Sequence, residues 1–207
     1  TKMGESVSTA DADDHIFGMV LFNDWSARDI QTWEYVPLGP FLAKNFASTI
    51  SPWIVTLDAL EPFRTKGYTQ EPKVLSYLEY DGDKNIDINL DVFIKPETSE
   101  ETLVSHSNYK FMYWTMEQQL AHHTVNGCNI NVGDMMASGT ISGPTPDSFG
   151  SMLEISWKGT KPVKMNDGSE RKFINDNDTV IMRGYCEKEG LRIGFGECKA
   201  TALPATK

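Results

Sequence analysis

Short apolar runs separated by turn residues dominate the hydrophobic pattern of the chain. Residues 86–94 alternate Ile, Leu and Val with Asp, Asn and Phe, which is the period-two pattern of a half-buried strand. Groups of Asp, Asn, Glu and Gly interrupt the runs at residues 81–83, 166–168, 176–178 and 189–190. The pattern predicts strands over residues 19–22, 51–60, 75–80, 86–94, 135–142 and 151–157, with 75–80 and 86–94 paired as a hairpin.

Two segments have a helical pattern instead. Residues 27–34 follow Ser26, and Asp29 stands three residues after that serine, as in a capping box. Residues 107–121 carry Phe, Trp and Leu at helical spacing, and two adjacent histidines follow them near the expected helix end. Neighbours on a helix do not face one point, so we expect capping and packing from this histidine pair rather than metal binding. One longer helix among many short strands predicts a mainly β fold with a few helices, arranged as a β-rich roll or sandwich.

An acid, two bases, an amide and a phenol stand close together after the first apolar run. Arg28, Gln31 and Tyr35 lie on one stripe of the first predicted helix, and Asp24 stands just ahead of it. On spacing alone, the commoner arrangement is an i,i+4 ion pair between Asp24 and Arg28 on a solvated helix. The alternative is a site for an anionic, oxygen-rich substrate, where Asp24 holds a divalent cation and Arg28 and Lys44 bind developing negative charge.

Six motifs carry a family resemblance. Residues 23–46 read NDWSARDIQTWEYVPLGPFLAKNF, and five shorter motifs follow in order: TISPW (49–53), MYWT (112–115), HHTVNGCN (122–129), ASGTISG (137–143) and GSMLEISWKGTK (150–161). In content and order these motifs resemble the carboxyl-terminal part of the fumarylacetoacetate hydrolase (fumarylacetoacetase) family, over the chain from about residue 15. The resemblance implies that family's fold, a mixed β-sandwich roll with a few helices. It also implies an enzyme that cleaves a carbon–carbon bond of 4-fumarylacetoacetate to fumarate and acetoacetate, which ends tyrosine and phenylalanine breakdown.

The resemblance implies a divalent cation, Mg²⁺ and/or Ca²⁺. Asp24 matches the aspartate that ligates the cation in the NDWSARD motif. Lys44 and Ser48 match positions that hold a second cation through backbone and hydroxyl oxygen, although threonine is the more usual residue where Ser48 stands. Oxygen donors of these kinds are what such hard cations prefer.

The resemblance also implies catalytic and substrate-binding roles. Glu154 matches the glutamate that orients a catalytic histidine, and Arg28 and Lys44 match residues that stabilise the oxyanion and the leaving carbanion. Gln31, Tyr35 and Thr140 match substrate-binding residues. From the residues alone, a lone carboxylate such as Glu154 is either solvated or hydrogen-bonded to a neighbour. A simple strand bulge accounts equally well for the small residues around Thr140.

Part of the family's pattern is not visible in the chain. Another aspartate ligand, an E-x-E pair of ligands and the catalytic histidine lie upstream of the matching motifs in the family. We therefore expect a loop or disordered start over residues 1–14 and a partial catalytic domain over residues 15–207, with the upstream portion absent. We expect the chain alone to bind the cation weakly and to turn over little substrate.

Composition narrows the class of protein. The formal net charge of −10 argues against a nucleic-acid-binding surface, which needs clustered bases. The sequence has no apolar run of about eighteen residues and no signal-peptide pattern, so we expect no membrane partner and a cytoplasmic protein. Its three cysteines lack CxxC spacing and suggest neither a zinc knuckle nor a disulfide framework. The family resemblance adds the expectation of a homodimer.

Two other functions fit the same residues. Relatives of this fold hydrolyse acylpyruvates or process other small diacids, so a related diketo-acid enzyme is the first alternative. A non-catalytic interaction protein derived from the fold is the second. The missing upstream ligands favour the interaction protein, whereas the retained Asp24, Arg28, Lys44 and Glu154 oppose it.

Overall fold

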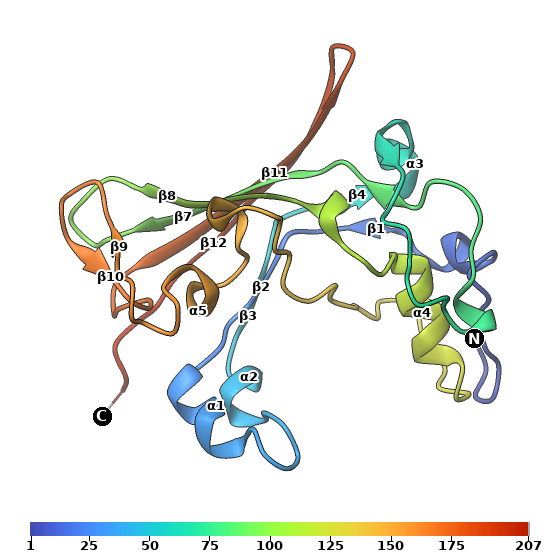
Figure 1. The fold of residues 1–207 in the computed structure, drawn as a ribbon, viewed down its shortest axis with the longest axis horizontal. Coiled ribbons are helices and arrows are strands. Elements are labelled where there is room, and N and C mark those ends of the chain that lie inside the picture. The colour runs from blue at the N-terminus through green and yellow to red at the C-terminus, as the bar shows by residue number, and fades with distance from the viewer. Residues whose placement is uncertain (207) are drawn as a thin grey trace.

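A four-stranded antiparallel sheet forms the centre of the molecule in the computed structural model, which describes residues 1–206 (Figure 1). The strand order is β12-β11-β7-β8. These strands are β7 (Asn89–Lys95), β8 (Thr102–Asn108), β11 (Thr179–Lys188) and β12 (Leu191–Thr201). Glu189 and Gly190 join β11 to β12 with φ of 51° and 84°, which suits a two-residue hairpin turn of the I′ type. The predicted turn at residues 189–190 and the mainly β fold class with few helices are both confirmed.

Four two-stranded sheets surround the central sheet. Each is antiparallel: β1 (Gly18–Met19) with β4 (Val55–Thr56), β2 (Phe22–Asp24) with β3 (Ser48–Ile50), β5 (Arg64–Thr65) with β6 (Asn85–Ile86), and β9 (Val163–Lys164) with β10 (Glu170–Arg171). The predicted strand over residues 19–22 is therefore divided between β1 and β2. This division lets the chain leave the body of the protein along β2 and return along β3.

The helices are short. The α-helices are α1 (Arg28–Glu34), α2 (Leu42–Asn45), α3 (Leu57–Leu60), α4 (Met116–Thr124) and α5 (Met152–Ile155). Single turns of 3-10 helix occur at η1 (Ala12–His15), η2 (Glu61–Phe63), η3 (Ser76–Leu78), η4 (Tyr109–Phe111) and η5 (Pro146–Ser148). Within residues 1–206, no helix has both the length and the apolar character needed to cross a lipid bilayer. The helices α1 and α2 form an arm, residues 28–45, that projects from the body beyond β2 and β3 (Figure 1).

The main core joins the central sheet to β4, α3 and α4. Its buried members are Leu21, Val55, Leu60, Phe63, Ile86, Ile88, Tyr109, Met116, Cys186, Phe195 and Cys198. A smaller cluster of Val7, Ala12, Leu120 and Ile130 attaches the first residues of the chain to α4. The ammonium of Thr1 also donates to the backbone oxygen of Ile130 at 2.8 Å. Residues 1–14, predicted to be a loop or disordered, thus contain turns and most of η1 and pack on the body.

Three predicted strands are wrong. Residues 75–80 contain the helical turn η3, so they do not form a hairpin with residues 86–94, and the alternating residues instead give β7 within the central sheet. Residues 135–142 form no regular element, and Gly139 there has φ of 80°. Residues 151–157 contain α5, because the Ser151 side chain caps the helix by accepting from the backbone N–H of Glu154.

Two further boundaries differ from the prediction. The predicted helix over residues 107–121 begins only at Met116, where Thr115 and Gln118 form a reciprocal capping box. Residues 107 and 108, which were predicted to start this helix, are the last two residues of β8. Within residues 51–60, only β4 is extended, because the Thr56 hydroxyl accepts from the backbone N–H of Ala59 and begins α3. In both places a capping side chain determines where the helix starts.

Candidate functional site

The arm brings the predicted metal-binding residues together. In the β2–β3 ladder, Asp24 is the register partner of Ser48. The Nζ of Lys44, at the end of α2, lies 2.6 Å from Oδ2 of Asp24 and 3.2 Å from its backbone oxygen. The same ammonium donates to Oγ of Ser26 at 2.7 Å. An ammonium has three protons, so these three acceptors occupy all of them.

Arg28 does not pair with Asp24 as the spacing suggested. Its Nη1 donates instead to Oε1 of Gln31 at 2.8 Å, so these two members of the predicted stripe do meet on α1. Tyr35 follows the helix as its carboxyl-terminal cap and is 64% exposed. The predicted cap is wrong: Ala27 is the N-cap, and the Ser26 hydroxyl donates to the backbone oxygen of Asp24 at 3.2 Å.

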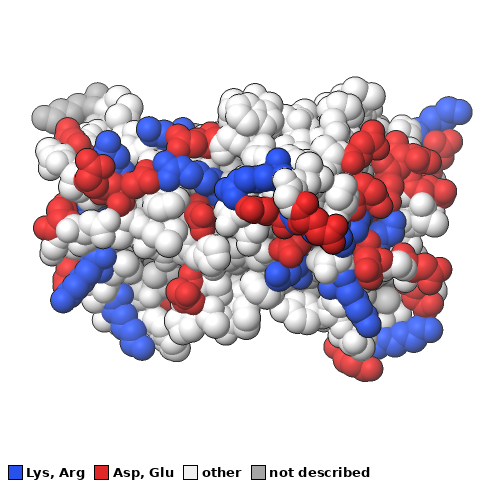
Figure 2. Space-filling view, turned by 90° about the horizontal axis from the view of Figure 1, so that it is seen from above, with Lys and Arg blue, Asp and Glu red and all other residues white. Residues whose placement is uncertain are grey.

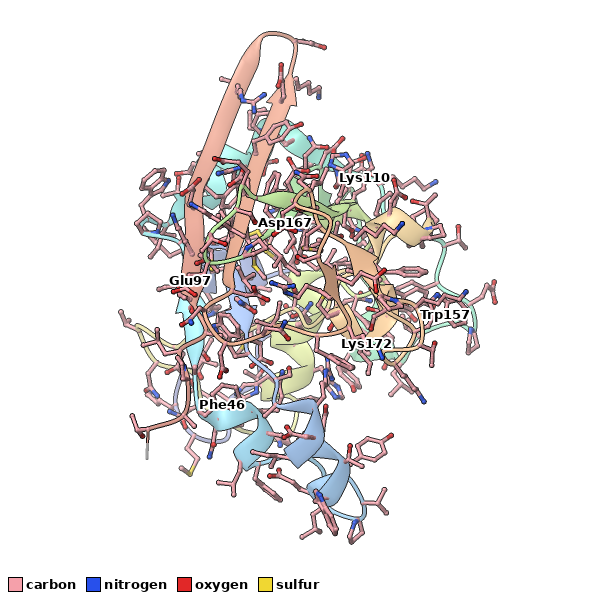
Figure 3. All side chains as sticks on the ribbon, turned by 90° about the vertical axis from the view of Figure 1, so that its left-hand side faces the viewer. Phe46, Glu97, Lys110, Trp157, Asp167 and Lys172 are labelled. Atoms are coloured by element: carbon pink, nitrogen blue, oxygen red, sulfur yellow. The ribbon has the colours of Figure 1, made fainter. Side chains whose placement is uncertain are left out.

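Polar contacts rather than core packing hold the arm. No residue of α1 is buried, and Trp33 is 90% exposed. The backbone N–H of Ala27 donates to the oxygen of Ala43 at 2.9 Å. The Glu34 carboxylate accepts from the backbone N–H groups of Phe41 and Ala43, which lie at the start of α2. Sequence reasoning missed this role of Glu34, because its partners lie beyond the Pro/Gly-rich turn. In Figure 3 the arm lies at the lower end of the molecule and Phe46 is labelled where it joins the body.

Glu154 lies on α5 and not on the predicted strand. Of the two environments considered for its carboxylate, solvated or hydrogen-bonded, the structure shows the hydrogen-bonded one. Its two carboxylate oxygens each lie 2.9 Å from Oγ of Ser142, and the Ser151 hydroxyl donates to Oε2 at 2.9 Å. Thr140 is exposed, and its methyl group lies against Gly150. In the view of Figure 1, α5 and the arm both lie below the central sheet.

The predicted metal-binding residues offer oxygen donors but few of them. Asp24 and Ser48 offer a carboxylate and a hydroxyl, and both are the oxygen donors that Mg²⁺ and Ca²⁺ prefer. The Asp24 side chain is 45% exposed, so it is accessible to an ion. Within residues 1–206, however, no three His, Cys, Asp or Glu side chains are placed to hold a metal together. The donor type fits a hard cation, and the number of donors is too small to hold one tightly.

The surroundings of this site are open. Two hollows among the described residues lie elsewhere, one of about 270 Å³ beside Tyr68 and Tyr80 and one of about 300 Å³ beside Val7 and Tyr77. Basic and acidic side chains alternate over the face seen in Figure 2, without a broad area of positive charge on that face.

A buried charge cluster lies away from this site, and sequence reasoning did not find it. Nη1 of Arg64 contacts Oε1 of Glu117 at 2.7 Å, and Glu117 is fully buried. Asp13 contacts Arg64 at 3.2 Å and Lys84 at 2.7 Å. Burial raises the pKa of Glu117 above its usual 4.5, although the Arg64 hydrogen bond opposes that change. Burial also disfavours ionised Asp13, but hydrogen bonds and the charges of Arg64 and Lys84 hold its pKa below the usual 3.8.

Comparison with known proteins places these residues in a family. The model described as "Fumarylacetoacetate (FAA) hydrolase C-terminal" matches residues 1–202. The chain is 62% identical to the fumarylacetoacetase of Dictyostelium discoideum over 210 residues, 58% to that of Homo sapiens over 205 and 51% to that of Arabidopsis thaliana over 205. These alignments cover 99–100% of the chain but 48–49% of each relative, so the chain spans about half the length of the curated relatives it matches. The match starts at residue 1, before the expected start near residue 15.

Proposed function

The chain belongs to the fumarylacetoacetate hydrolase C-terminal family, and from this premise we propose that it forms the carboxyl-terminal part of a fumarylacetoacetase. That enzyme hydrolyses a carbon–carbon bond of 4-fumarylacetoacetate and releases fumarate and acetoacetate. The relatives of the chain, at 51–62% identity, all carry the name fumarylacetoacetase, which supports this substrate over acylpyruvates and supports an enzyme over an interaction protein.

The observation that carries the proposal is the contact of Lys44 with Asp24 on the arm. Breaking a carbon–carbon bond next to a carbonyl releases an enolate, whose negative charge must be stabilised as it forms. Lys44 and Arg28 supply positive charge for this purpose on the same arm. A divalent cation on Asp24, Mg²⁺ or Ca²⁺, would act as a Lewis acid on the diketone oxygens of the substrate. In this proposal the Ser48 hydroxyl and the Lys44 backbone supply oxygen donors to a second cation.

The remaining groups bind substrate or position water. Three side chains are proposed to hydrogen-bond the substrate. They are Gln31, which accepts from Arg28, Tyr35 at the exposed end of α1, and Thr140 beside Gly150. Glu154 is proposed to orient a histidine that removes a proton from the attacking water. His106 contacts Asp91 and His122 contacts Tyr77, so neither takes this place in the described structure. We propose that this histidine and the other metal ligands come from outside residues 1–206.

Exposed surface supports an assembly with further polypeptide. The described surface is 12727 Å², whereas a folded monomer of 23.2 kDa exposes about 9,700 Å² by size scaling. The difference, about 3,000 Å², is of the size that a permanent interface buries. It fits cover by the remainder of a longer protein and by a second copy in a homodimer. A cytoplasmic location completes the proposal. Sedimentation of the natural protein that contains this chain tests the dimer.

Hydrolysis of 4-fumarylacetoacetate, compared between the isolated chain and the natural protein that contains it, tests the function. We expect activity in the natural protein, loss of that activity in Asp24→Ala, and little or no activity in residues 1–207 alone. Calorimetric titration with Mg²⁺ and Ca²⁺ is expected to show weak binding to the isolated chain that Asp24→Ala removes. Preference for acylpyruvates in a panel of diketo acids would replace the substrate assignment, and absence of both hydrolysis and cation binding would favour the interaction protein.

A further inference from the structure

The contacts around Glu154 point to Ser142 as a positioning residue. We propose that Ser142 fixes the plane of the Glu154 carboxylate, so that this carboxylate can orient its partner in the reaction. This inference rests on the proposed function and adds a residue to it. Oγ of Ser142 lies 2.9 Å from both oxygens of that carboxylate, which places the hydroxyl proton between them.

A glutamate carboxylate needs such a contact to keep one orientation. Rotation about its last side-chain bond has a broad energy minimum, so packing alone does not fix the carboxylate plane. The Ser142 hydroxyl and the Ser151 hydroxyl donate from two directions, and each bond is 2.9 Å long. An ionised carboxylate has about four acceptor sites. These two donors therefore leave acceptor sites free for the N–H of an imidazole.

Ser142 is itself held in place through its neighbours in the chain. The Ile141 carbonyl accepts from the Ser107 hydroxyl of β8 at 3.1 Å. The Gly143 N–H donates to the Ser148 carbonyl at 2.8 Å. Ile141 also packs against the main core. Both sides of Ser142 are thus attached to the body of the protein, although residues 135–142 form no regular element.

A backbone N–H orients the Ser142 hydroxyl toward Glu154. Gly150 N–H donates to Oγ of Ser142 at 3.1 Å, so the hydroxyl accepts from one side and donates its proton to the carboxylate on the other. Such chains of hydrogen bonds strengthen one another. A Cβ on Gly150 would lie 2.7 Å from the Ile141 oxygen and from the Thr140 methyl, so only glycine allows this approach. Gly150 therefore connects Ser142 to Thr140, the proposed substrate-binding residue.

Ser142 and Ser151 differ in what their loss would change. Ser151 caps α5 in addition to contacting Glu154, so its removal also weakens the helix. Ser142 lies outside α5 and reaches it through the Glu154 carboxylate. Ser142→Ala is consequently the cleaner substitution, and Ser138→Ala is its matched control, because the Ser138 hydroxyl donates only to the adjacent Gly139 carbonyl at 3.1 Å.

A double-mutant cycle in the natural protein that contains this chain tests the inference. Ser142→Ala is expected to lower kcat by about 10- to 100-fold with little change in KM, as for other residues that orient a group at a metal site. In a Glu154→Gln background, the same substitution is expected to change kcat by less than about twofold, because the group it positions is already lost. Ser142→Thr, which keeps a hydroxyl, is expected to restore much of the rate, and Ser138→Ala is expected to behave as the unmodified protein.

Equal losses from Ser142→Ala in both backgrounds, or no loss in either, would overturn the inference. A crystal structure of the Ser142→Ala protein provides a readout that needs no activity. The Glu154 carboxylate is expected to rotate or occupy several orientations there, and an unchanged single orientation would refute the role of Ser142. Ser142→Gly, which also removes the hydroxyl, serves the same purpose should the alanine variant be insoluble. Absence of hydrolysis in the unmodified protein would instead remove the proposed function, while the crystallographic result still decides whether Ser142 positions Glu154.

Discussion

Two ion pairs in this protein lie in opposite environments. The side chains of Asp24, at the end of β2, and Lys44, on the arm, are 45% and 29% exposed. Those of Glu117 and Arg64, within the body, are 0% and 11% exposed. Solvated pairs contribute little to stability because water already screens both charges. Buried pairs have lost that solvation, and removing one partner leaves the other charge without compensation. The two contacts have nearly the same length, 2.6 Å for Asp24 with Lys44 and 2.7 Å for Glu117 with Arg64, but their loss has different consequences.

Under the proposed function, the difference separates a structural use of charge from a chemical one. Arg64 and Glu117 connect β5 to α4, and Asp13 and Lys84 extend the same cluster to η1 and to the residue before β6. These ion pairs hold η1, β5, β6 and α4 together. Asp24 ends β2 where the chain enters the arm, and Lys44 lies on the arm, which has few core contacts, so a ligand can replace their mutual contact at small cost to the fold. The comparison predicts that substitution of the buried pair affects folding most, whereas substitution of the exposed pair affects chemistry most.

The largest loss of stability is expected for Arg64→Met. The substitution keeps much of the side-chain volume but leaves buried Glu117 with only Lys84, 4.0 Å away, as a charged neighbour, which costs about 3–5 kcal/mol in the free energy of unfolding. Urea denaturation measures this loss. Glu61→Gln is the control, because it removes only the 70% exposed partner of Arg64, 3.2 Å away, and is expected to cost less than about 1 kcal/mol. If Arg64→Met also lowered the free energy of unfolding by less than about 1 kcal/mol, the buried pair would not differ from the exposed pair in its effect on stability.

A smaller, pH-dependent loss is expected for Asp13→Asn. Because the folded-state pKa of Asp13 lies below the usual 3.8, its carboxylate stabilises the fold fully above that pH and loses this contribution as pH falls below it. The variant should be less stable than the unmodified chain near pH 7, by on the order of 1 kcal/mol, and the two should converge in acid. Urea denaturation at several pH values measures the difference. Asp14→Asn changes the exposed neighbouring residue, and its stability should differ from that of the unmodified chain by nearly zero at every pH. A stability difference for Asp13→Asn that does not change with pH would contradict the assigned role.

Local signals in the sequence predicted the elements that depend on local residues. The alternation in residues 86–94 predicted β7, and the Glu-Gly pair predicted the β11–β12 turn, because strand period and turn conformation are properties of neighbouring residues. Similarly, α1 was predicted almost to its ends. In contrast, Leu153, Ile155 and Trp157 alternate as in a strand, yet the Ser151 cap and the positive φ of 49° at Trp157 produce a short helix that stops there.

Contacts between distant segments set the parts of the site that the sequence did not predict. Spacing favoured Arg28 as the partner of Asp24, whereas Lys44 takes that place, because the turn after α1 folds α2 back against β2. Ser142 and Glu154 are twelve residues apart and meet only when the 140–150 segment closes on α5. Glu117 is buried although its helix is largely polar, and its charged partner Arg64 comes from β5, far away in the sequence. Family resemblance supplied residue roles, but not these partners.

The smallest change in stability is expected at Lys44. Lys44→Gln removes an exposed ammonium, so the free energy of unfolding in urea should change by less than about 1 kcal/mol. If Lys44 stabilises the enolate, the same substitution should reduce kcat for 4-fumarylacetoacetate by about 10²–10³-fold in the natural protein that contains this chain. Lys73→Gln, in another exposed pair with Glu79 at 2.9 Å, should alter neither quantity appreciably. A Lys44→Gln protein that is unstable but fully active when folded would reverse the comparison, since the arm would then use its charge for structure, as the buried cluster does.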